Sequence, residues 1–256
     1  MTNAISPDLL LEAARECAAL AGAVAFSHYQ TKVAVETKGD GSPVTIADRS
    51  AEERVREWIR IRFPGDGILG EEFGEHAGTS RRRWIVDPID GTKAFVRGVP
   101  LWGSLVAVVE GEEVLAGAAT FPALGESIAA ASGCGSWHNG SRCRVSSESD
   151  IRAATALITD DRIFPDSRST DRWRTLAGTV AICRSWGDAF GYLMVATGRA
   201  EIMVDAIVNA WDIACFLPII REAGGAFTDL AGKTTAFGGN CVATNAALAA
   251  EARRIL

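Results

Sequence analysis

Lysine, histidine and aromatic residues are scarce in this sequence of 256 residues. Lysine occurs four times against 22 arginines, Phe, Trp and Tyr together make up 7%, and the three histidines stand far apart. Isolated histidines exclude the paired ligands of a zinc hydrolase helix and a Cys/His zinc cage. The six cysteines include no Cys-x-x-Cys pair, so we expect reduced thiols and no disulfide framework.

Signals for membranes, export and nucleic acids are also missing. No apolar run approaches the roughly 18 residues that a membrane span needs, and the first residues lack the basic and then apolar segments of a secretory signal. We therefore expect a cytoplasmic protein with no membrane partner. The net charge of −6 argues against non-specific nucleic-acid binding, which needs many cations matched to phosphates.

Apolar residues, in contrast, are sufficient for a large core. They make up 48% of the chain, and a protein of this length buries about 70% of its surface on folding. Hydrophobic periodicity predicts two long helices, then short strands, then strands and helices in alternation. The predicted helices span 7–30, 45–63, 170–177, 187–198, 210–223 and 245–256, and the predicted strands span 32–37, 68–69, 84–86, 102–109, 114–120, 126–131, 143–145, 156–159, 180–184, 201–204, 226–229 and 241–244.

This order of elements predicts an α/β protein in two unlike halves. The first half is α+β with an antiparallel sheet, and the second is α/β. The polar and unpatterned segment 146–150 is the best boundary between them. We therefore expect an N-terminal α+β subdomain over residues 1–146 that carries most of the functional site, and a C-terminal α/β subdomain over residues 147–256 that contributes Asp212 and the substrate pocket.

The segment Asp87-Pro88-Ile89-Asp90-Gly91-Thr92 carries the clearest chemical signal. The apolar residues before it predict a buried strand that ends at the first acid. Pro88 prevents a return to regular pairing, so the two aspartates can converge, and Gly91 and Thr92 open a short helix whose free N–H groups suit an anion. Carboxylates beside such amides are typical of a Mg²⁺-dependent phosphate site. The alternative is an acidic turn that caps a helix.

Further acids occur where such a site would need them. Glu71 and Glu72 follow a short predicted strand, Asp212 begins a helix after Asn209, and Asp48 lies in the first turn of the second helix. Each alone could be an ordinary acid at a helix N-terminus. Their combination with the Asp87 segment favours a shared site.

These segments resemble the inositol monophosphatase superfamily over nearly the whole chain. The resemblance rests on Gly70-Glu71-Glu72, on the segment from Asp87 to Thr92, on Trp211-Asp212 and on Glu222-Ala223-Gly224-Gly225. The segments Lys93–Gly103 and Ser185–Ala189 look most like the histidinol-phosphatase branch. The resemblance implies a layered αβαβα fold, a homodimer, and two or three bound Mg²⁺ ions.

The resemblance also implies a role for each matching residue. A first Mg²⁺ would be held by Glu71, Asp87 and the Ile89 carbonyl, a second by Asp87, Asp90 and Asp212, and a weaker third by Glu71 and water. The catalytic residues would be Glu71 and Thr92, which position the attacking water, and Asp48, which hydrogen-bonds Thr92. The amides of Gly91 and Thr92 would bind the phosphate, and Asp205 would contact the rest of the substrate.

Simple electrostatics favours cations at this cluster. Two carboxylates about 4 Å apart repel each other by roughly 4 kcal/mol at an effective dielectric constant near 20. Two Mg²⁺ ions would activate water and neutralise the phosphoryl group, so no covalent aspartyl intermediate is needed. The rival haloacid-dehalogenase arrangement uses Asp-x-Asp on one strand end, whereas here two residues, one of them Pro88, separate Asp87 from Asp90.

Side chains around the leaving group must select the phosphate ester. Asp188 and Asp205 would add negative charge there, which favours a cationic leaving group. Histidinol phosphate, cleaved to histidinol and phosphate in histidine biosynthesis, fits this pattern. Arg184 and Lys93 could pair with these acids or with the phosphate, and we leave both open. Alternatives are inositol 1-phosphate or another small sugar phosphate, a non-catalytic phosphate-binding protein, and for Asp188 a simple helix cap.

Overall fold

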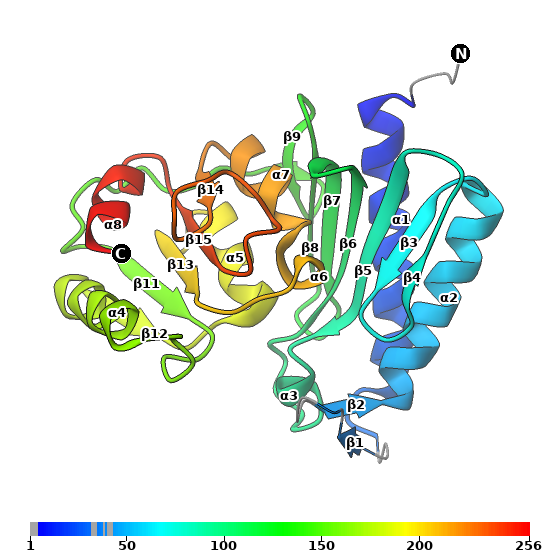
Figure 1. Ribbon diagram of the computed structural model, residues 1–256, viewed down its shortest axis with the longest axis horizontal. Coiled ribbons are helices and arrows are strands. Elements are labelled where there is room, and N and C mark those ends of the chain that lie inside the picture. The colour runs from blue at the N-terminus through cyan, green and yellow to red at the C-terminus, as the bar shows by residue number, and fades with distance from the viewer. Residues whose placement is uncertain (1–4, 32–34, 38, 40–42) are drawn as a thin grey trace.

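Two long helices pack side by side along the outer face of a large sheet (Figure 1). The computed structural model describes residues 5–31, 35–37, 39 and 43–256. Helix α1 (Pro7–His28) begins after Ser6, whose hydroxyl accepts the Leu9 N–H at 3.3 Å. Helix α2 (Ile46–Arg62) begins after Thr45 with a capping box. Both predicted helices are confirmed, because local capping chemistry sets their starts.

A short hairpin precedes α2. Strand β1 (Val35–Thr37) pairs antiparallel with β2 (Pro43–Thr45). The first part of the predicted strand 32–37, residues 32–34, lies outside the described residues.

The large sheet has eight strands in the order β10-β9-β8-β7-β6-β5-β3-β4. The predicted antiparallel sheet is confirmed for every neighbouring pair except β3 and β5, which run parallel. A turn at Asn139 and Gly140 joins β9 to β10, with both residues at positive φ, whereas the strand predicted over residues 143–145 does not form. The strands are β3 (Gly67–Gly70), β4 (Gly74–His76), β5 (Arg82–Asp90), β6 (Gly103–Glu110), β7 (Glu113–Phe121), β8 (Glu126–Ala131), β9 (Gly135–His138) and β10 (Ser141–Arg142).

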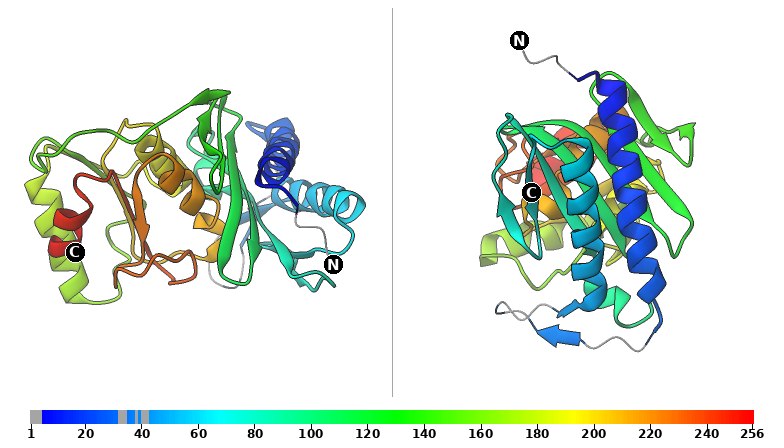
Figure 2. Two further views of the ribbon diagram at one scale, coloured as in Figure 1. Left: turned by 90° about the horizontal axis from the view of Figure 1, so that it is seen from above. Right: turned by 90° about the vertical axis from the view of Figure 1, so that its right-hand side faces the viewer.

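The second sheet has five strands in the order β12-β11-β13-β15-β14, with parallel and antiparallel pairs. Its strands are β11 (Thr155–Ile158), β12 (Ile182–Arg184), β13 (Ile202–Asp205), β14 (Ala226–Thr228) and β15 (Cys241–Thr244), and the helices around it are α4 (Ser167–Thr179), α5 (Asp188–Ala196), α6 (Ala210–Ile213), α7 (Phe216–Glu222) and α8 (Ala249–Ile255). Helices α5, α6 and α7 lie between the two sheets, and α4 and α8 cover the far side (Figures 1 and 2). The predicted αβαβα layering is confirmed.

The central helices join the two sheets into one core. Leu105 of the large sheet, Leu193 and Ile219 of the central helices, and Met203 of the second sheet belong to one buried cluster. The predicted division after residue 146 stays a prediction. Among the described residues, no helix is long and apolar enough to cross a membrane.

Three elements of the second half have different bounds from those that the sequence predicts. The helix expected over 210–223 is two helices, α6 and α7, because Pro218 has no N–H for the Ala214 carbonyl. The strand expected from residue 180 begins at Ile182, because Val180 caps α4. Helix α8 begins at Ala249 and not at Asn245, whose side chain accepts the Leu248 N–H at 2.9 Å.

Candidate metal and phosphate site

A bulge in β5 brings two acids to the same side of the strand. The predicted strand end at Asp87 was wrong, because β5 continues to Asp90. Its pairing with β6 shifts by one residue between Asp87, opposite Leu105, and Asp90, opposite Gly103. Residues three apart on a regular strand point to opposite faces, and one extra residue cancels this alternation. The Asp87 carboxylate accepts the Ile89 N–H at 3.0 Å and thereby holds the bulge.

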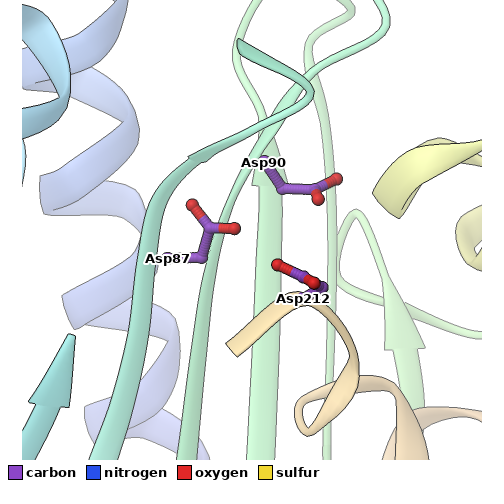
Figure 3. A group of neighbouring side chains, drawn as sticks. All are labelled: Asp87, Asp90 and Asp212. Carbon is purple, nitrogen blue, oxygen red and sulfur yellow. The ribbon is translucent and has the colours of Figure 1, made fainter. Parts of the chain in front are cut away.

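Asp212 completes a cluster of three carboxylates with these two. It comes from the first turn of α6, in a capping box with Asn209. One oxygen of each carboxylate lies within 4.8 Å of the others, and Figure 3 shows the three side chains converging from β5 and α6. The sequence therefore placed Asp87, Asp90 and Asp212 together correctly, although they are up to 125 residues apart.

Asp87 and Asp90 of this cluster are buried, and Asp212 is half-buried. Burial raises the pKa of Asp87 well above its ordinary value, and three neighbouring carboxylates raise it further. Burial raises the pKa of Asp90 in the same way, although the Ala189 N–H, which Asp90 accepts, acts against this. Burial also raises the pKa of Asp212 to about 7. These shifts express first the free-energy cost of removing charged carboxylates from water, and then their mutual repulsion.

Glu71 lies next to Asp87. Its backbone N–H donates to the Val86 carbonyl at 3.2 Å, which ties the end of β3 to β5 immediately before the bulge. A hydrogen bond between the two carboxyl groups contributes to the raised pKa of Asp87. Glu72 follows on the same turn, and the backbone N–H of Glu72 donates to a buried carboxylate of α2.

Thr92 and Asp48 meet next to Ile89, within the bulge. The Thr92 hydroxyl lies 3.0 Å from the Ile89 carbonyl and 3.5 Å from an Asp48 oxygen. The second Asp48 oxygen accepts the N–H and the hydroxyl of Thr45 at 2.7 and 2.6 Å, which fixes the carboxylate at the start of α2. Burial, with a smaller contribution from Glu71, raises the pKa of Asp48.

A cavity of about 220 Å³ opens beside the cluster. The predicted phosphate-binding residues Gly91 and Thr92 line it, as do the predicted substrate contacts Asp188 and Asp205. The remaining lining residues are Asp90, Lys93, Thr159, Tyr192, Ile207, Val208 and Asp212. Gly91 has φ of +82°, and a Cβ there would lie 2.9 Å from the Leu101 carbonyl oxygen, so only glycine suits this position.

The two acids of the substrate side are held differently. Asp205 is buried, accepts the Tyr192 hydroxyl at 2.7 Å, and has its pKa raised by burial to about 7. Asp188 adopts φ of +49°, in the left-handed region, and its N–H donates to the Thr159 hydroxyl at 2.8 Å. Burial raises the pKa of Asp188 to about 6, while Lys93 acts in the opposite direction.

Arg184 does not reach this cavity. Its side chain is exposed and donates to the neighbouring Cys183 carbonyl at 2.7 Å. Lys93 lines the cavity, which favours it over Arg184 as a cation near the substrate. Trp102 is fully buried against Phe95 and Tyr29, so it is a core residue.

Sequence reasoning missed Thr159, Tyr192 and Glu52. The first two hold the predicted substrate acids by hydrogen bonds, and nothing in their local sequence marks them. Glu52 accepts two amides of the turn after β3. Its spacing of four residues from Asp48 places both on one face of α2, a signal that could have been used.

The donor set suits Mg²⁺. All candidate ligands are oxygens, namely carboxylates and the Ile89 carbonyl, which are the atoms that Mg²⁺ prefers. Carboxylates that converge within 4.8 Å of one another are also an arrangement that a divalent cation stabilises. The residues present therefore fit the metal that the sequence predicted.

Comparison with known proteins identifies the family of this chain. A model of the inositol monophosphatase family matches residues 6–256. The chain belongs to this family. It is similar to a histidinol-phosphatase of Chlorobaculum parvum, with 43% identity over 240 residues that cover 92% of this chain and 90% of the relative. A histidinol-phosphatase of Mycobacterium tuberculosis is 40% identical and covers 84% of both chains.

A solved structure shows the same fold. The Thermotoga maritima IMPase superposes with a TM-score of 0.83 at 31% identity, over 94% of this chain and 93% of the other. The predicted superfamily and its fold are thus confirmed, and this member of the inositol monophosphatase family is a phosphatase.

Proposed function

We propose that this family member is a Mg²⁺-dependent phosphomonoesterase that hydrolyses histidinol phosphate to histidinol and phosphate. The observation that carries the proposal is the convergence of Asp87, Asp90 and Asp212 within 4.8 Å, beside a cavity lined by Gly91 and Thr92. The resemblance to histidinol-phosphatases at up to 43% identity supports the choice of substrate and the role in histidine biosynthesis.

The metal ligands proposed are those implied by the sequence. Glu71, Asp87 and the Ile89 carbonyl would hold one Mg²⁺, and Asp87, Asp90 and Asp212 a second, with a third at Glu71 left open. When bound, Mg²⁺ supplies positive charge that acidifies water and neutralises the phosphoryl group.

The protein's own groups orient the attacking water. The Thr92 hydroxyl has two acceptors, Ile89 O at 3.0 Å and Asp48 at 3.5 Å. Because a hydroxyl has a single proton to donate, its lone pairs stay available for a water proton. We propose that Thr92 and Glu71 hold this water, that Asp48 fixes Thr92, and that the amides of Gly91 and Thr92 bind the phosphate.

Asp188 and Asp205 favour a cationic leaving group. Both line the cavity together with Asp90 and Asp212, and a carboxylate there attracts an amine or imidazolium and gains little from a neutral polyol. The left-handed backbone of Asp188 is itself a strained conformation of the kind that persists at functional sites.

A substrate panel tests the proposal. We expect Mg²⁺-dependent phosphate release from histidinol phosphate with a higher kcat/KM than from inositol 1-phosphate, and no release in EDTA. A preference for inositol 1-phosphate or another sugar phosphate would support the alternative activity in the same site. No release from any phosphomonoester would contradict both.

A single substitution tests the electrostatic part. Asn also tolerates the left-handed conformation, so Asp188→Asn removes charge without changing the backbone. We expect kcat/KM to fall about tenfold for histidinol phosphate, equivalent to about 1.4 kcal/mol, and to stay nearly unchanged for inositol 1-phosphate. Equal losses on both substrates would contradict selection by charge. The predicted homodimer, cytoplasmic location and role of Arg184 stay predictions.

A further inference from the structure

Three charged residues form a buried stripe along one face of α2. Asp48, Glu52 and Arg56 are spaced by four residues, so they lie above one another on the helix, and all three are buried. Glu52 has no exposed surface and Arg56 has 6%. Buried charges need hydrogen-bonded partners. Asp48 has its partners in Thr45 and Thr92, and Glu52 and Arg56 bind the turn between β3 and β4.

Glu52 binds that turn through its backbone. Its carboxylate accepts the Glu72 N–H at 2.8 Å and the Phe73 N–H at 3.2 Å. Arg56 Nε donates to the same carboxylate at 2.7 Å, and another nitrogen of its guanidinium donates to the Gly74 carbonyl. Glu52 and Arg56 therefore hydrogen-bond to the backbone of three consecutive residues directly after Glu71.

The backbone at Gly70 shows how closely the carboxylate approaches. A Cβ built on Gly70 would lie 1.9 Å from Glu52 Oε1, so no side chain fits between the end of β3 and the helix. Glu71 is thus fixed from both sides: its own N–H donates to the Val86 carbonyl on β5, and the next two amides donate to Glu52.

We propose that Glu52, supported by Arg56, is a positioning residue that holds Glu71 toward Asp87 and so sets the affinity of the site for Mg²⁺. This inference rests on the proposed function. Helix α2 then serves the site twice, because Asp48 in its first turn lies 3.5 Å from the Thr92 hydroxyl and Glu52 one turn later fixes the turn of Glu71.

Glu52→Gln tests this with a small change of shape. A glutamine presents one oxygen and one NH₂ group, so an amide of the turn or Arg56 loses its acceptor. We expect the Mg²⁺ concentration that gives half of the thermal stabilisation, measured without substrate, to rise at least tenfold, the usual effect of losing an outer partner of a metal ligand. Phosphate release should need correspondingly more Mg²⁺, with kcat at saturating Mg²⁺ little changed.

Asp66→Asn is the matched control. Asp66 is also a buried carboxylate with an arginine partner, Arg82, but it precedes β3 at the end opposite Glu71. Its loss should lower thermal stability as Glu52→Gln does, and leave half-saturation by Mg²⁺ as in the wild type. Equal half-saturation in Glu52→Gln, Asp66→Asn and the wild type would overturn the proposal.

A double variant shows whether Glu52 acts through Glu71. In a Glu71→Gln background, adding Glu52→Gln should shift half-saturation no further, and an undiminished tenfold shift there would contradict the proposed route. Should Glu52→Gln fail to fold, Arg56→Lys, which keeps the charge but loses the planar fork, should raise half-saturation about threefold. A folded Arg56→Lys protein with wild-type Mg²⁺ binding would overturn the proposal. Wild-type protein without Mg²⁺-dependent phosphate release would instead contradict the proposed function.

Discussion

Two groups of buried carboxylates in this protein differ in what neutralises them. Asp66 is bound by Arg82 through two hydrogen bonds of 3.1 Å and by the indole N–H of Trp84 at 3.0 Å. Glu52 lies against Arg56 at 2.7 Å and accepts two backbone amides. In this group the chain itself supplies the opposite charge and the hydrogen bonds.

The other group is Asp87, Asp90 and Asp212, which face one another (Figure 3). Within the part of the chain that the structure describes, no lysine or arginine forms an ion pair with any of them. Such an arrangement opposes folding unless protons or an external cation compensate it. The acids of the first group thus have their partners within the chain. The acids of the second group depend on protons or a bound cation for compensation.

The largest effect should come from removing an acid of the unpaired group. We expect Asp87→Asn to lower kcat/KM for phosphate release by at least about 10³-fold, because it removes about 4 kcal/mol or more of transition-state stabilisation by the metal site. The same variant in EDTA should melt no lower than the wild type, since it removes one repelling charge. Phosphate release and thermal unfolding in EDTA measure the two effects. Wild-type turnover, or a large drop in Tm in EDTA, would contradict the comparison.

The opposite pattern is expected for the paired group. Asp66→Asn should lower the free energy of unfolding by about 3–5 kcal/mol, because it leaves the half-buried guanidinium of Arg82 and the buried indole N–H of Trp84 without their charged partner. Activity measured well below Tm should stay within about twofold of the wild type, since Asp66 lies away from the cavity. Urea unfolding, together with phosphate release at low temperature, measures both. A loss of activity without a loss of stability would contradict the purely structural role of Asp66.

The unpaired group also predicts an unusual pH dependence of the metal-free protein. An unfolded aspartate has a pKa near 3.8, and Asp212 has about 7 in the fold. Between these values the folded state binds more protons than the unfolded state, so stability is full below the lower pKa and is lost as pH rises toward the upper one.

In EDTA we therefore expect Tm to fall by at least about 5 °C between pH 5.5 and pH 8, roughly 2 kcal/mol for a chain of this size. Added Mg²⁺ should restore Tm at pH 8 more than at pH 5.5, since protons and the cation compensate the same charges. Scanning calorimetry at both pH values tests this. Asp90→Asn should flatten the profile, and an equally steep fall in that variant would assign the effect elsewhere.

The helices and the acid motif could be predicted from sequence because their causes are local. Ser6 and Thr45 cap α1 and α2 within three residues, and the alternation of hydrophobic residues gave most strands. The motif around Asp87, together with the Glu71 and Asp212 segments and the family that they resemble, predicted which acids meet. The bulge that brings Asp87 and Asp90 to the same side of β5 was not predictable, because it depends on pairing with β6, a separate strand.

Hydrogen bonds between distant segments could not be predicted from the sequence for the same reason. Glu52 and its turn are 20 residues apart, and Tyr192 reaches Asp205 from another element. Pro218 is a sequence signal for the break between α6 and α7, but the apolar pattern around it favoured one continuous helix. The exposure of the Arg184 side chain was not predictable either, because it depends on the path of β12, and its role at the substrate stays a prediction.

Two fully buried tryptophans carry the smallest predicted effect, and they repeat the contrast between paired and unpaired groups. Trp84 donates its indole N–H to Asp66 at 3.0 Å, whereas the Trp102 indole N–H has no acceptor among the described residues. Substitution by phenylalanine removes similar volume in both cases, so packing losses largely cancel when the two variants are compared. We expect Trp84→Phe to cost about 2 kcal/mol more than Trp102→Phe, the value of a hydrogen bond to a charged group. Urea unfolding of the two single variants measures this difference, and equal costs would mean that the Asp66 network does not depend on the indole.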